Sequence, residues 1–245
     1  MLMRRLMRED PRIRYCRQPE NLGIFGNFQF VLAQARGEFF MWAADDDEWE
    51  PTFVERCMAL AGERGSVLCG FRTHLRATGE LLDNPIPDLD PQRDCHGNVA
   101  RFFATMQPSL FYGLHRRAEI GFVLEDRFFD FYDCYFVLRV LVEHGFRTFP
   151  EVLYRAGVDA PEREIKYADT GRRTLDYGTF LLRGVSTLLA CRALGLRQKQ
   201  DLLMRLRSVL EGLVRHHDPD VRPLGRLAAD AWRSVTGPAR RQPVR

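Results

Sequence analysis

The sequence lacks any closely spaced pair of cysteines. Its six cysteines include no CxxC motif and no neighbouring Cys/His pair, and they are spread along the chain at Cys16, Cys57, Cys69, Cys95, Cys134 and Cys191. Structural zinc sites and the disulfide frameworks of small secreted domains both depend on regular cysteine spacing. The pattern therefore argues against both kinds of site and predicts free thiols in a reducing compartment.

The sequence also lacks a long, uninterrupted apolar run. Its most apolar segment, residues 175–196, contains the charged residues Asp176, Arg183 and Arg192. A membrane-spanning helix needs about 20 predominantly apolar residues, so this segment is not expected to cross a bilayer. Arginines interrupt the first residues of the chain, which disagrees with a secretory signal. We expect a cytoplasmic protein, and peripheral contact with a membrane stays open.

A strong net charge is missing too. The formal net charge is +3 over 245 residues, which is too small to predict nucleic-acid binding. The positive charge is concentrated at the ends, in residues 1–8 and 239–245, as is typical of solvated termini. Hydrophobic residues make up 45% and charged residues 28%, as in ordinary globular proteins, and no internal repeat is visible. The length allows one large domain, alone or with an appendage.

Predicted strands and helices alternate along the first 155 residues, and helices dominate afterwards. Apolar runs and turn residues predict strands at 13–16, 39–44, 67–75, 107–115 and 146–155. Helical spacing predicts helices at 1–9, 24–35, 51–64, 99–106, 130–144, 174–194 and 196–216. This order favours an α/β domain over residues 1–157, followed by a helical extension with a basic tail over residues 158–245.

One of the predicted strands ends in consecutive carboxylates. The apolar run 39–44 is followed directly by Asp45, Asp46, Asp47 and Glu48. Such side chains repel one another unless a hard cation binds them, and open α/β sheets bind ligands beyond the carboxyl ends of their strands. A metal and phosphate site is one interpretation. The other is a solvated turn that caps the helix predicted from residue 51, and the local pattern leaves both open.

A second acidic group lies at the start of the predicted helix 130–144. It consists of Asp126, Asp130 and Asp133. Carboxylates stabilise the first turn of a helix, so capping accounts for Asp130. Asp133 lies deeper among aromatic residues, where a raised pKa would suit a general base.

The block from residue 21 to residue 55 resembles the family-2 glycosyltransferases. These proteins carry an N-x-G loop, a helix, an A-x-G-E turn and an acidic strand end with a proline four residues beyond its last Asp. The matching positions are Asn21, Gly23, Ala35, Gly37, Glu38, Asp45 to Asp47 and Pro51. Downstream, Asp133 precedes Arg139 by six residues, as in the family's base motif, and QPSLFYGLHRR resembles its acceptor-side segment. The resemblance covers residues 11–157.

The resemblance implies a GT-A fold, with a Rossmann-like mixed α/β sheet, and transfer of a sugar with inversion. It implies a nucleoside diphosphate-sugar donor and a glycan, lipid-linked or protein acceptor, as in polysaccharide biosynthesis. The implied cofactor is Mg²⁺ or Mn²⁺, held by Asp46 with help from Asp45 and Asp47, and Asp133 is the implied base. Residues expected to bind donor or acceptor are Asn21, Gly23, Trp49, Tyr112, His115 and Asp130.

The sequence departs from the family pattern at three places. Ala44 occupies the position of the first Asp of the metal motif, and Tyr132 replaces an acidic residue before the base. The family's first strand-helix-strand unit has no counterpart, which predicts a truncated domain that binds nucleotide-sugar poorly. Two alternatives therefore accompany the transferase hypothesis: a non-catalytic remnant and a metal-dependent phosphate-processing enzyme.

Overall fold

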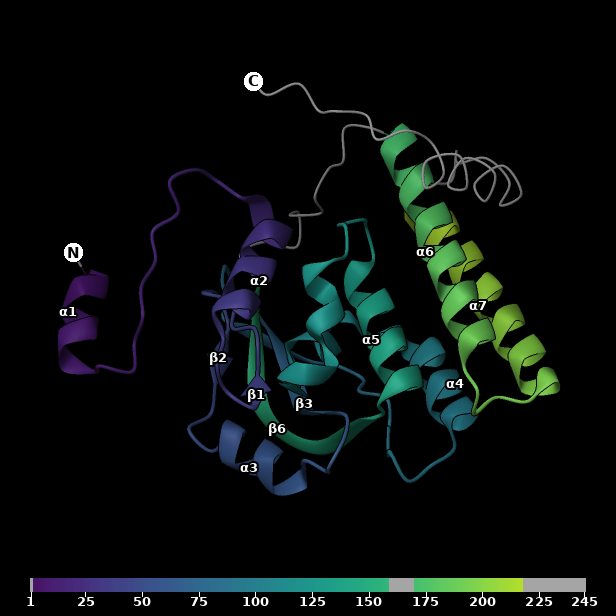
Figure 1. Cartoon of the computed structure of the whole chain (residues 1–245), viewed down its shortest axis with the longest axis horizontal. Coiled ribbons are helices and arrows are strands. Elements are labelled where there is room, and N and C mark those ends of the chain that lie inside the picture. Colours follow the sequence, from purple (N-terminus) through teal and green to yellow (C-terminus); the bar gives the residue numbers. More distant parts are fainter. Residues whose placement is uncertain (1, 159–169, 218–245) are drawn as a thin grey trace. The chain divides into compact units, whose positions relative to one another are not determined.

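A computed structural model describes residues 2–158 and 170–217 of the chain (Figure 1). The chain forms two compact units, Met1–Ala35 and Arg36–Arg245. The first unit contains helices α1 (Leu2–Glu9) and α2 (Gly23–Gln34). Residues 13–16, predicted as a strand, are not one, and the Arg14 side chain instead donates a 3.0 Å hydrogen bond to the carbonyl oxygen of Gln34.

A six-stranded mixed sheet forms the centre of the second unit. The strands run in the order β1-β5-β3-β6-β2, and β4 pairs with β3 beside this path. Strands β3 and β6 are parallel, and the other pairs are antiparallel. The strands are β1 (Phe39–Phe40), β2 (Glu48–Trp49), β3 (Ser66–Leu75), β4 (Glu80–Asp83), β5 (Leu114–Arg116) and β6 (Phe146–Val158). The predicted mixed α/β sheet is confirmed.

The central pair of strands is interrupted by an irregularity. Cys69 pairs with Phe149 and Gly70 with Val152, so two residues of β6 are left out of the register. One of them is Pro150, which has no N–H to donate and is tolerated in a sheet interior only at a bulge. A Cβ atom on Gly70 would lie 2.7 Å from the carbonyl oxygen of Pro150, so glycine is needed at this close approach.

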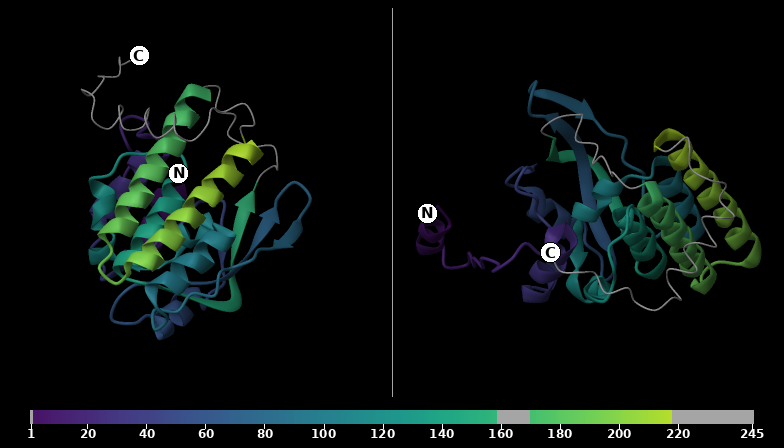
Figure 2. Two further views of the ribbon diagram at one scale, coloured as in Figure 1. Left: turned by 90° about the vertical axis from the view of Figure 1, so that its right-hand side faces the viewer. Right: turned by 90° about the horizontal axis from the view of Figure 1, so that it is seen from above.

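Helices cover the sheet in layers (Figure 2). Helix α3 (Phe53–Leu60) contacts β3, β5 and β6. Helices α4 (Cys95–Thr105) and α5 (Tyr132–Glu143) pack together, and α6 (Thr170–Ala190) and α7 (Leu196–His217) pack onto them, α6 on α5 and α7 on α4. The described part of the predicted extension therefore belongs to the same compact unit as the sheet.

Buried aromatic rings join α5 to the sheet. Trp42 stacks on Phe111 with ring centroids 4.3 Å apart, and both rings contact Phe136 of α5 edge-on. Offset and edge-to-face arrangements of this kind add about 0.5–1.5 kcal/mol per pair beyond the area they bury.

The predicted strand 39–44 shortens to β1 because only Phe39 and Phe40 pair with β5.

The segment 107–115 differs from its predicted strand. Residues Pro108–Tyr112 form a 3-10 helix, and only Leu114–Arg116 forms a strand, β5. Proline fits the first turn of a helix, and the Gln107 side chain accepts a hydrogen bond from the backbone N–H of Ser109. The local capping groups therefore override the apolar run, and Tyr112 comes at the end of the helical turn.

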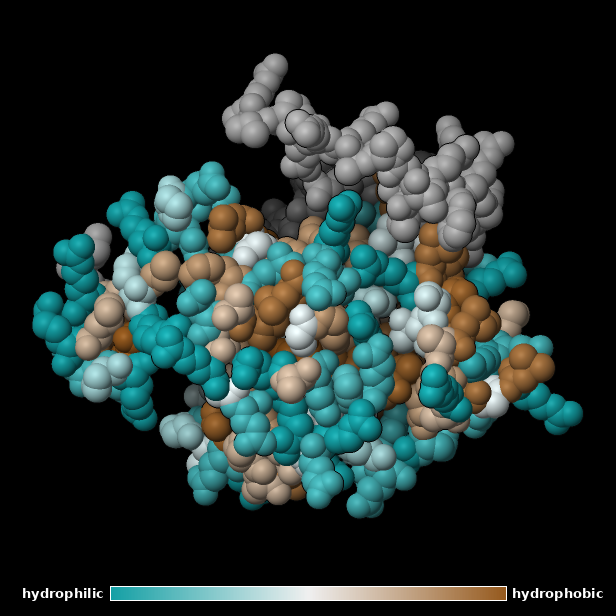
Figure 3. Space-filling model, viewed as in Figure 1, coloured by the Kyte–Doolittle hydropathy of each residue, from teal (hydrophilic) through white to brown (hydrophobic). Residues whose placement is uncertain are grey.

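Of the described helices, none combines the length and apolarity required to span a membrane. The face in Figure 3 is mainly hydrophilic, with separate hydrophobic patches. The exposed apolar side chains include Leu189, Leu196 and Met204 near the turn between α6 and α7 and along α7.

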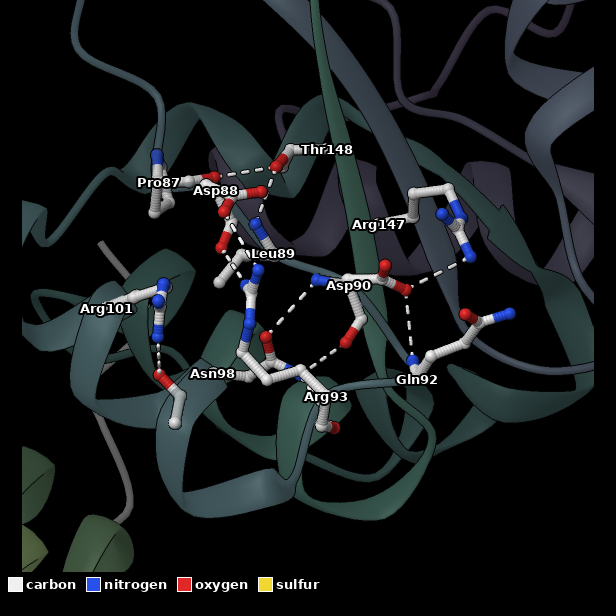
Figure 4. Close-up of polar contacts among 11 residues, drawn as sticks. Pro87, Asp88, Leu89, Asp90, Gln92, Arg93, Asn98, Arg101, Arg147 and Thr148 are labelled. Carbon is white, nitrogen blue, oxygen red and sulfur yellow. Dashed lines mark hydrogen bonds and ion pairs between the residues drawn. The ribbon is translucent and has the colours of Figure 1, made fainter.

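A polar network orders the irregular loop before α4 (Figure 4). Asn98 is buried at 3% exposure; its side-chain oxygen accepts from the backbone N–H of Asp90, and its amide donates to the carbonyl oxygen of Asp90 at 2.7 Å. Thr148 of β6 bonds to the backbone of Pro87 and Leu89 in the same loop. The loop is therefore fixed to the sheet and to α4 at once.

We expect Asn98→Ala to lower the free energy of unfolding by about 1–3 kcal/mol, because it removes the acceptor of the part-buried Asp90 N–H and one of the two donors to the Asp90 carbonyl oxygen. Chemical denaturation measures this loss. Gln92→Ala is the matched control, since the Gln92 side chain is exposed and only its backbone N–H joins the network. Equal stability of the two variants would contradict the role given to Asn98.

Candidate active site

The three aspartates after β1 have different surroundings. Asp47 is held by β6: its Oδ1 accepts from the backbone N–H of Gly157 at 3.0 Å, and its Oδ2 accepts from the Tyr154 hydroxyl at 2.8 Å. Burial raises the pKa of Asp47, although these two hydrogen bonds lower it. Asp47 therefore anchors the acidic loop to the sheet.

The side chains of Asp45 and Asp46 are available for a ligand. Asp45 is exposed and Asp46 is half-buried, and within residues 2–158 and 170–217 neither carboxylate accepts a hydrogen bond. The backbone of Asp46, in contrast, is fixed, because Arg76 donates to its carbonyl oxygen at 2.5 Å. The loop thus presents two carboxylates on a backbone that is held in place.

Gly157 lies directly against the backbone of the acidic loop. A Cβ atom on this residue would overlap the carbonyl oxygen of Asp46 and lie 3.0 Å from Nε of Arg76. The sequence reasoning missed Gly157, Tyr154 and Arg76, which lie far from the acidic residues along the chain. A glycine near the end of an aromatic strand was the one visible signal, since such a glycine often marks a close backbone approach.

Tyr112 lies under the influence of both acidic groups. Burial and, after it, the negative charges of Asp47, Asp133 and Asp46 together raise the pKa of Tyr112 to about 12. Those carboxylates come from two segments that are separated by more than 80 residues in the sequence. The fold therefore brings the two predicted acidic groups near one phenol, at the end of the 3-10 helix.

Asp133 occupies the first turn of α5. Its side chain is half-buried, and Oδ1 accepts a 2.7 Å hydrogen bond from the backbone N–H of Cys134. Burial raises the pKa of Asp133, the hydrogen bond from Cys134 lowers it, and the negative charge of Asp130 raises it. A carboxylate with a raised pKa is better suited to accepting a proton near neutral pH.

The other predicted binding residues nearby are Trp49 and Asp130. Trp49 stacks on Tyr154 with ring centroids 5.5 Å apart, next to the acidic loop. Asp130 is 7% exposed, and in the described part of the chain its Oδ1 has no hydrogen-bond partner. The negative charge of Asp130 raises the pKa of Asp133, the candidate base.

His115 lies in the core instead of lining a pocket. The residue is fully buried, Nδ1 is 2.6 Å from the Ser66 hydroxyl, and Nε2 is 2.9 Å from the carbonyl oxygen of Phe111. Burial lowers the pKa of His115 to about 4, so the ring is neutral at physiological pH. The predicted contact of His115 with donor or acceptor is corrected here, because a ligand does not reach a side chain with no exposed surface.

The predicted residues Asn21 and Gly23 belong to the first compact unit. The Asn21 side chain accepts a 2.8 Å hydrogen bond from the backbone N–H of Gly23 at the start of α2. Gly23 has φ of +71°, a left-handed conformation that favours glycine. The N-x-G pattern therefore shapes the loop before α2.

The arginines of the two downstream family-like segments, Arg116, Arg117 and Arg139, bind other parts of the second unit. Arg117 donates to the carbonyl oxygen of Gly37 at 2.7 Å, and Arg116 to that of Gly62 at 2.6 Å. Arg139 pairs with Glu143 and lies over the ring of Phe122. Arg117 thus secures the chain just before β1, and Arg116 secures the residues that follow α3.

The profile of Glycosyl transferase family 2 matches residues 2–123. The chain belongs to this family. The match includes the acidic loop and Tyr112, and it ends before Asp133. Comparison with curated proteins finds no match.

Solved structures of the glycosyltransferase-like fold resemble the chain. S. aureus TarS 1-349 in complex with UDP-GlcNAc has a TM-score of 0.68 and 15% sequence identity, covering 94% of this chain and 66% of TarS 1-349. TarS 1-349 without that ligand gives a TM-score of 0.66, with 16% identity and coverage of 96% and 67%. At these identities the likeness shows the fold, which agrees with the predicted GT-A class. The chain spans about two thirds of the TarS fragment.

Proposed function

We propose that this protein transfers a sugar from a nucleoside diphosphate-sugar to an acceptor hydroxyl with inversion. The observation that carries the proposal is the convergence of both acidic groups on Tyr112, whose pKa is raised by burial and also by Asp46, Asp47 and Asp133. Carboxylates of both acidic groups, one proposed to stabilise charge and the other to accept a proton, thus lie near one residue in a chain of family 2. The TarS complex contains UDP-GlcNAc, which makes this donor the first one to test.

In the proposed reaction Asp133 acts as the general base. The acceptor oxygen forms a bond to the anomeric carbon while the bond from that carbon to the diphosphate oxygen breaks on the opposite face. The hydroxyl proton moves to the Asp133 carboxylate, and the nucleoside diphosphate leaves with the electron pair. General bases of this kind contribute about 10²–10⁴-fold to rate. Tyr112 and Trp49 are proposed to contact donor or acceptor between the two acidic groups.

The acidic loop would hold a divalent cation whose remaining ligands come from the substrate. In the described part of the chain, no group of three or more His, Cys, Asp or Glu side chains is arranged to hold a metal ion. Mg²⁺ in phosphate-processing sites commonly uses one or two carboxylates together with substrate phosphates. Asp46 and Asp45 would hold it, because Asp47 is occupied by Gly157 and Tyr154. When bound, Mg²⁺ or Mn²⁺ stabilises negative charge on the departing diphosphate.

We expect Asp46→Asn to remove most of the Mn²⁺-dependent binding of UDP-GlcNAc, because the variant loses the charge of an unengaged carboxylate. Isothermal titration calorimetry with and without Mn²⁺ measures the difference. Glu48→Gln is the matched control and should change binding little, since Glu48 lies near Arg155 and His74. Equal Mn²⁺-dependent affinity in wild type and Asp46→Asn would count against the metal assignment.

The overall activity is tested by incubating the full-length natural protein with UDP-GlcNAc and other nucleoside diphosphate-sugars. Release of nucleoside diphosphate, with a sugar transferred to an acceptor or to water, supports the proposal. Release of inorganic phosphate would favour a phosphate-processing enzyme instead. Binding and turnover that are absent with every donor would favour a non-catalytic protein.

A further inference from the structure

Helix α6 packs against the segment that leads into Asp133. Residues 125–131 connect the 3-10 helix Gly121–Leu124 to α5, and Asp133 lies two residues beyond this connection. Figure 1 shows α6 alongside α5, and the two helices are in direct contact. Contacts from α6 reach four residues of the connecting segment: Asp126, Phe129, Asp130 and Phe131.

The first contact is made at a strained residue. Phe131 precedes the first turn of α5 and has φ of +67°, a left-handed conformation that is rare for a bulky side chain. Its ring stacks on that of Tyr177 with centroids 5.2 Å apart, and it also contacts Phe180. Both partners lie on α6 and are fully buried. Strained conformations of this kind persist only where the surrounding structure enforces them.

The second contact fixes the neighbouring backbone. The N–H of Asp130 donates a 3.2 Å hydrogen bond to Oδ2 of Asp176, a residue of α6 that is 8% exposed. The two residues before α5, Asp130 and Phe131, are therefore both held from α6.

The third and fourth contacts come from Arg183. Its guanidinium donates to Oδ1 of Asp126 at 2.6 Å, while Oδ2 of Asp126 accepts from the Tyr132 hydroxyl at 2.9 Å. The same guanidinium lies 5.3 Å from the ring centroid of Phe129. Arg183 thus joins the start of the connecting segment to the first residue of α5.

These contacts act on Asp133 through the place where α5 begins. Among the described residues, the Asp133 carboxylate accepts its hydrogen bond from its own neighbour, Cys134, and this bond moves with the helix end and does not fix it. The direction of the carboxylate is therefore set by the backbone of residues 130–132. We infer that Asp176, Tyr177 and Arg183 of α6 are positioning residues for Asp133, an inference that rests on the proposed function.

The test is Arg183→Gln in the full-length natural protein, assayed by hydrolysis of UDP-GlcNAc with water as acceptor. Misplacing a reacting group by about 1 Å is associated with a loss of reaction rate of up to about 10²-fold. We expect kcat to fall by about 10-fold or more while KM for UDP-GlcNAc changes less than about twofold, because Arg183 lies on the base side and not at the acidic loop. Arg183→Lys keeps the positive charge but lacks the planar guanidinium group, and it should recover part of the lost kcat.

Arg207→Gln is the matched control, because Arg207 is exposed on α7 and pairs with Glu211 within the same helix. It should leave kcat and KM unchanged. If Arg183→Gln does not fold, Arg183→Lys carries the test, again by a lowered kcat at constant KM. A kcat within about twofold of wild type in the folded Arg183 variants would overturn the inference.

Hydrogen exchange gives a second measurement that needs no turnover. Arg183→Gln should increase amide exchange in residues 126–134 and leave residues 44–50 unchanged. Unchanged exchange in both segments would also overturn the inference. Wild-type protein that transfers no sugar from any donor, either to an acceptor or to water, contradicts the proposed function. Active wild type with unaffected Arg183 variants contradicts the positioning role alone.

Discussion

Replacing Gly157 with alanine is expected to abolish turnover of UDP-GlcNAc and to destabilise the protein. The added methyl group would overlap the backbone carbonyl oxygen of Asp46 and press on the Arg76 side chain. Backbone does not move aside as a flexible side chain does, so the acidic loop must shift away from β6. That shift breaks the hydrogen bond from the Gly157 N–H to Asp47 and moves the carboxylates proposed to hold the metal.

Overpacking of this kind typically costs about 1–3 kcal/mol. For a domain of this size, 1 kcal/mol lowers the melting temperature by about 2–4 °C. Differential scanning fluorimetry measures the stability, and release of nucleoside diphosphate measures turnover. Gly121→Ala is the matched control, because a Cβ atom on Gly121 meets no atom within 4 Å. A Gly157→Ala variant with wild-type stability and turnover would contradict the support that we assign to this residue.

Asp133→Asn is expected to lower kcat by about 10²-fold or more without loss of stability. The amide keeps the shape of the carboxylate and can still accept the hydrogen bond from Cys134, but it does not take a proton. Affinity for the donor should be retained, since the proposed role of Asp133 is toward the acceptor. Calorimetry with UDP-GlcNAc and turnover measured on the same preparation separate the two effects.

The raised pKa of Asp133 gives this prediction a pH dependence. Only the ionised carboxylate accepts a proton, so turnover should fall as the pH drops through the raised pKa. The groups around the carboxylate that shape this limb are Cys134, Asp130 and Tyr112. Activity measured from about pH 4 to pH 9, on either side of the pKa range of perturbed Asp residues, defines the acid limb.

Stability should show the opposite trend. Because the folded pKa lies above the unfolded value of about 3.9, the folded state binds more protons between the two values, and stability falls as the pH rises through that window. Asp133→Asn lacks this destabilising charge. Its melting temperature relative to wild type should therefore be higher above the folded pKa and equal below the unfolded pKa.

Asp83→Asn serves as the control for this pair of measurements, because Asp83 is exposed on β4 and pairs with Arg72. It should alter neither turnover nor the acid limb. Normal turnover in Asp133→Asn would move the base elsewhere, and Asp130 is the next candidate because it lies close enough to influence Asp133.

Several elements follow directly from local sequence patterns. Helix α5 and strands β3 and β6 form close to their predicted bounds, since their apolar residues repeat with clear helical or extended spacing. Segment 107–115 was predicted wrongly as a strand, because the turn chemistry of Gln107 and Pro108 outweighs the apolar run. The short strand β4 was missed because its residues are all exposed and give no burial pattern.

By itself, the sequence determined the mixed α/β class, the family and the two acidic groups at Asp45 to Asp47 and at Asp133. Motifs of this kind are local, so their order and spacing are visible in one dimension. Only the tertiary structure decided that His115 is a core residue, that Gly157 and Tyr154 hold Asp47, and that α6 contacts the segment before Asp133. Those relations join residues tens of positions apart, and their physical basis is packing and hydrogen bonding that exist only after the chain has folded.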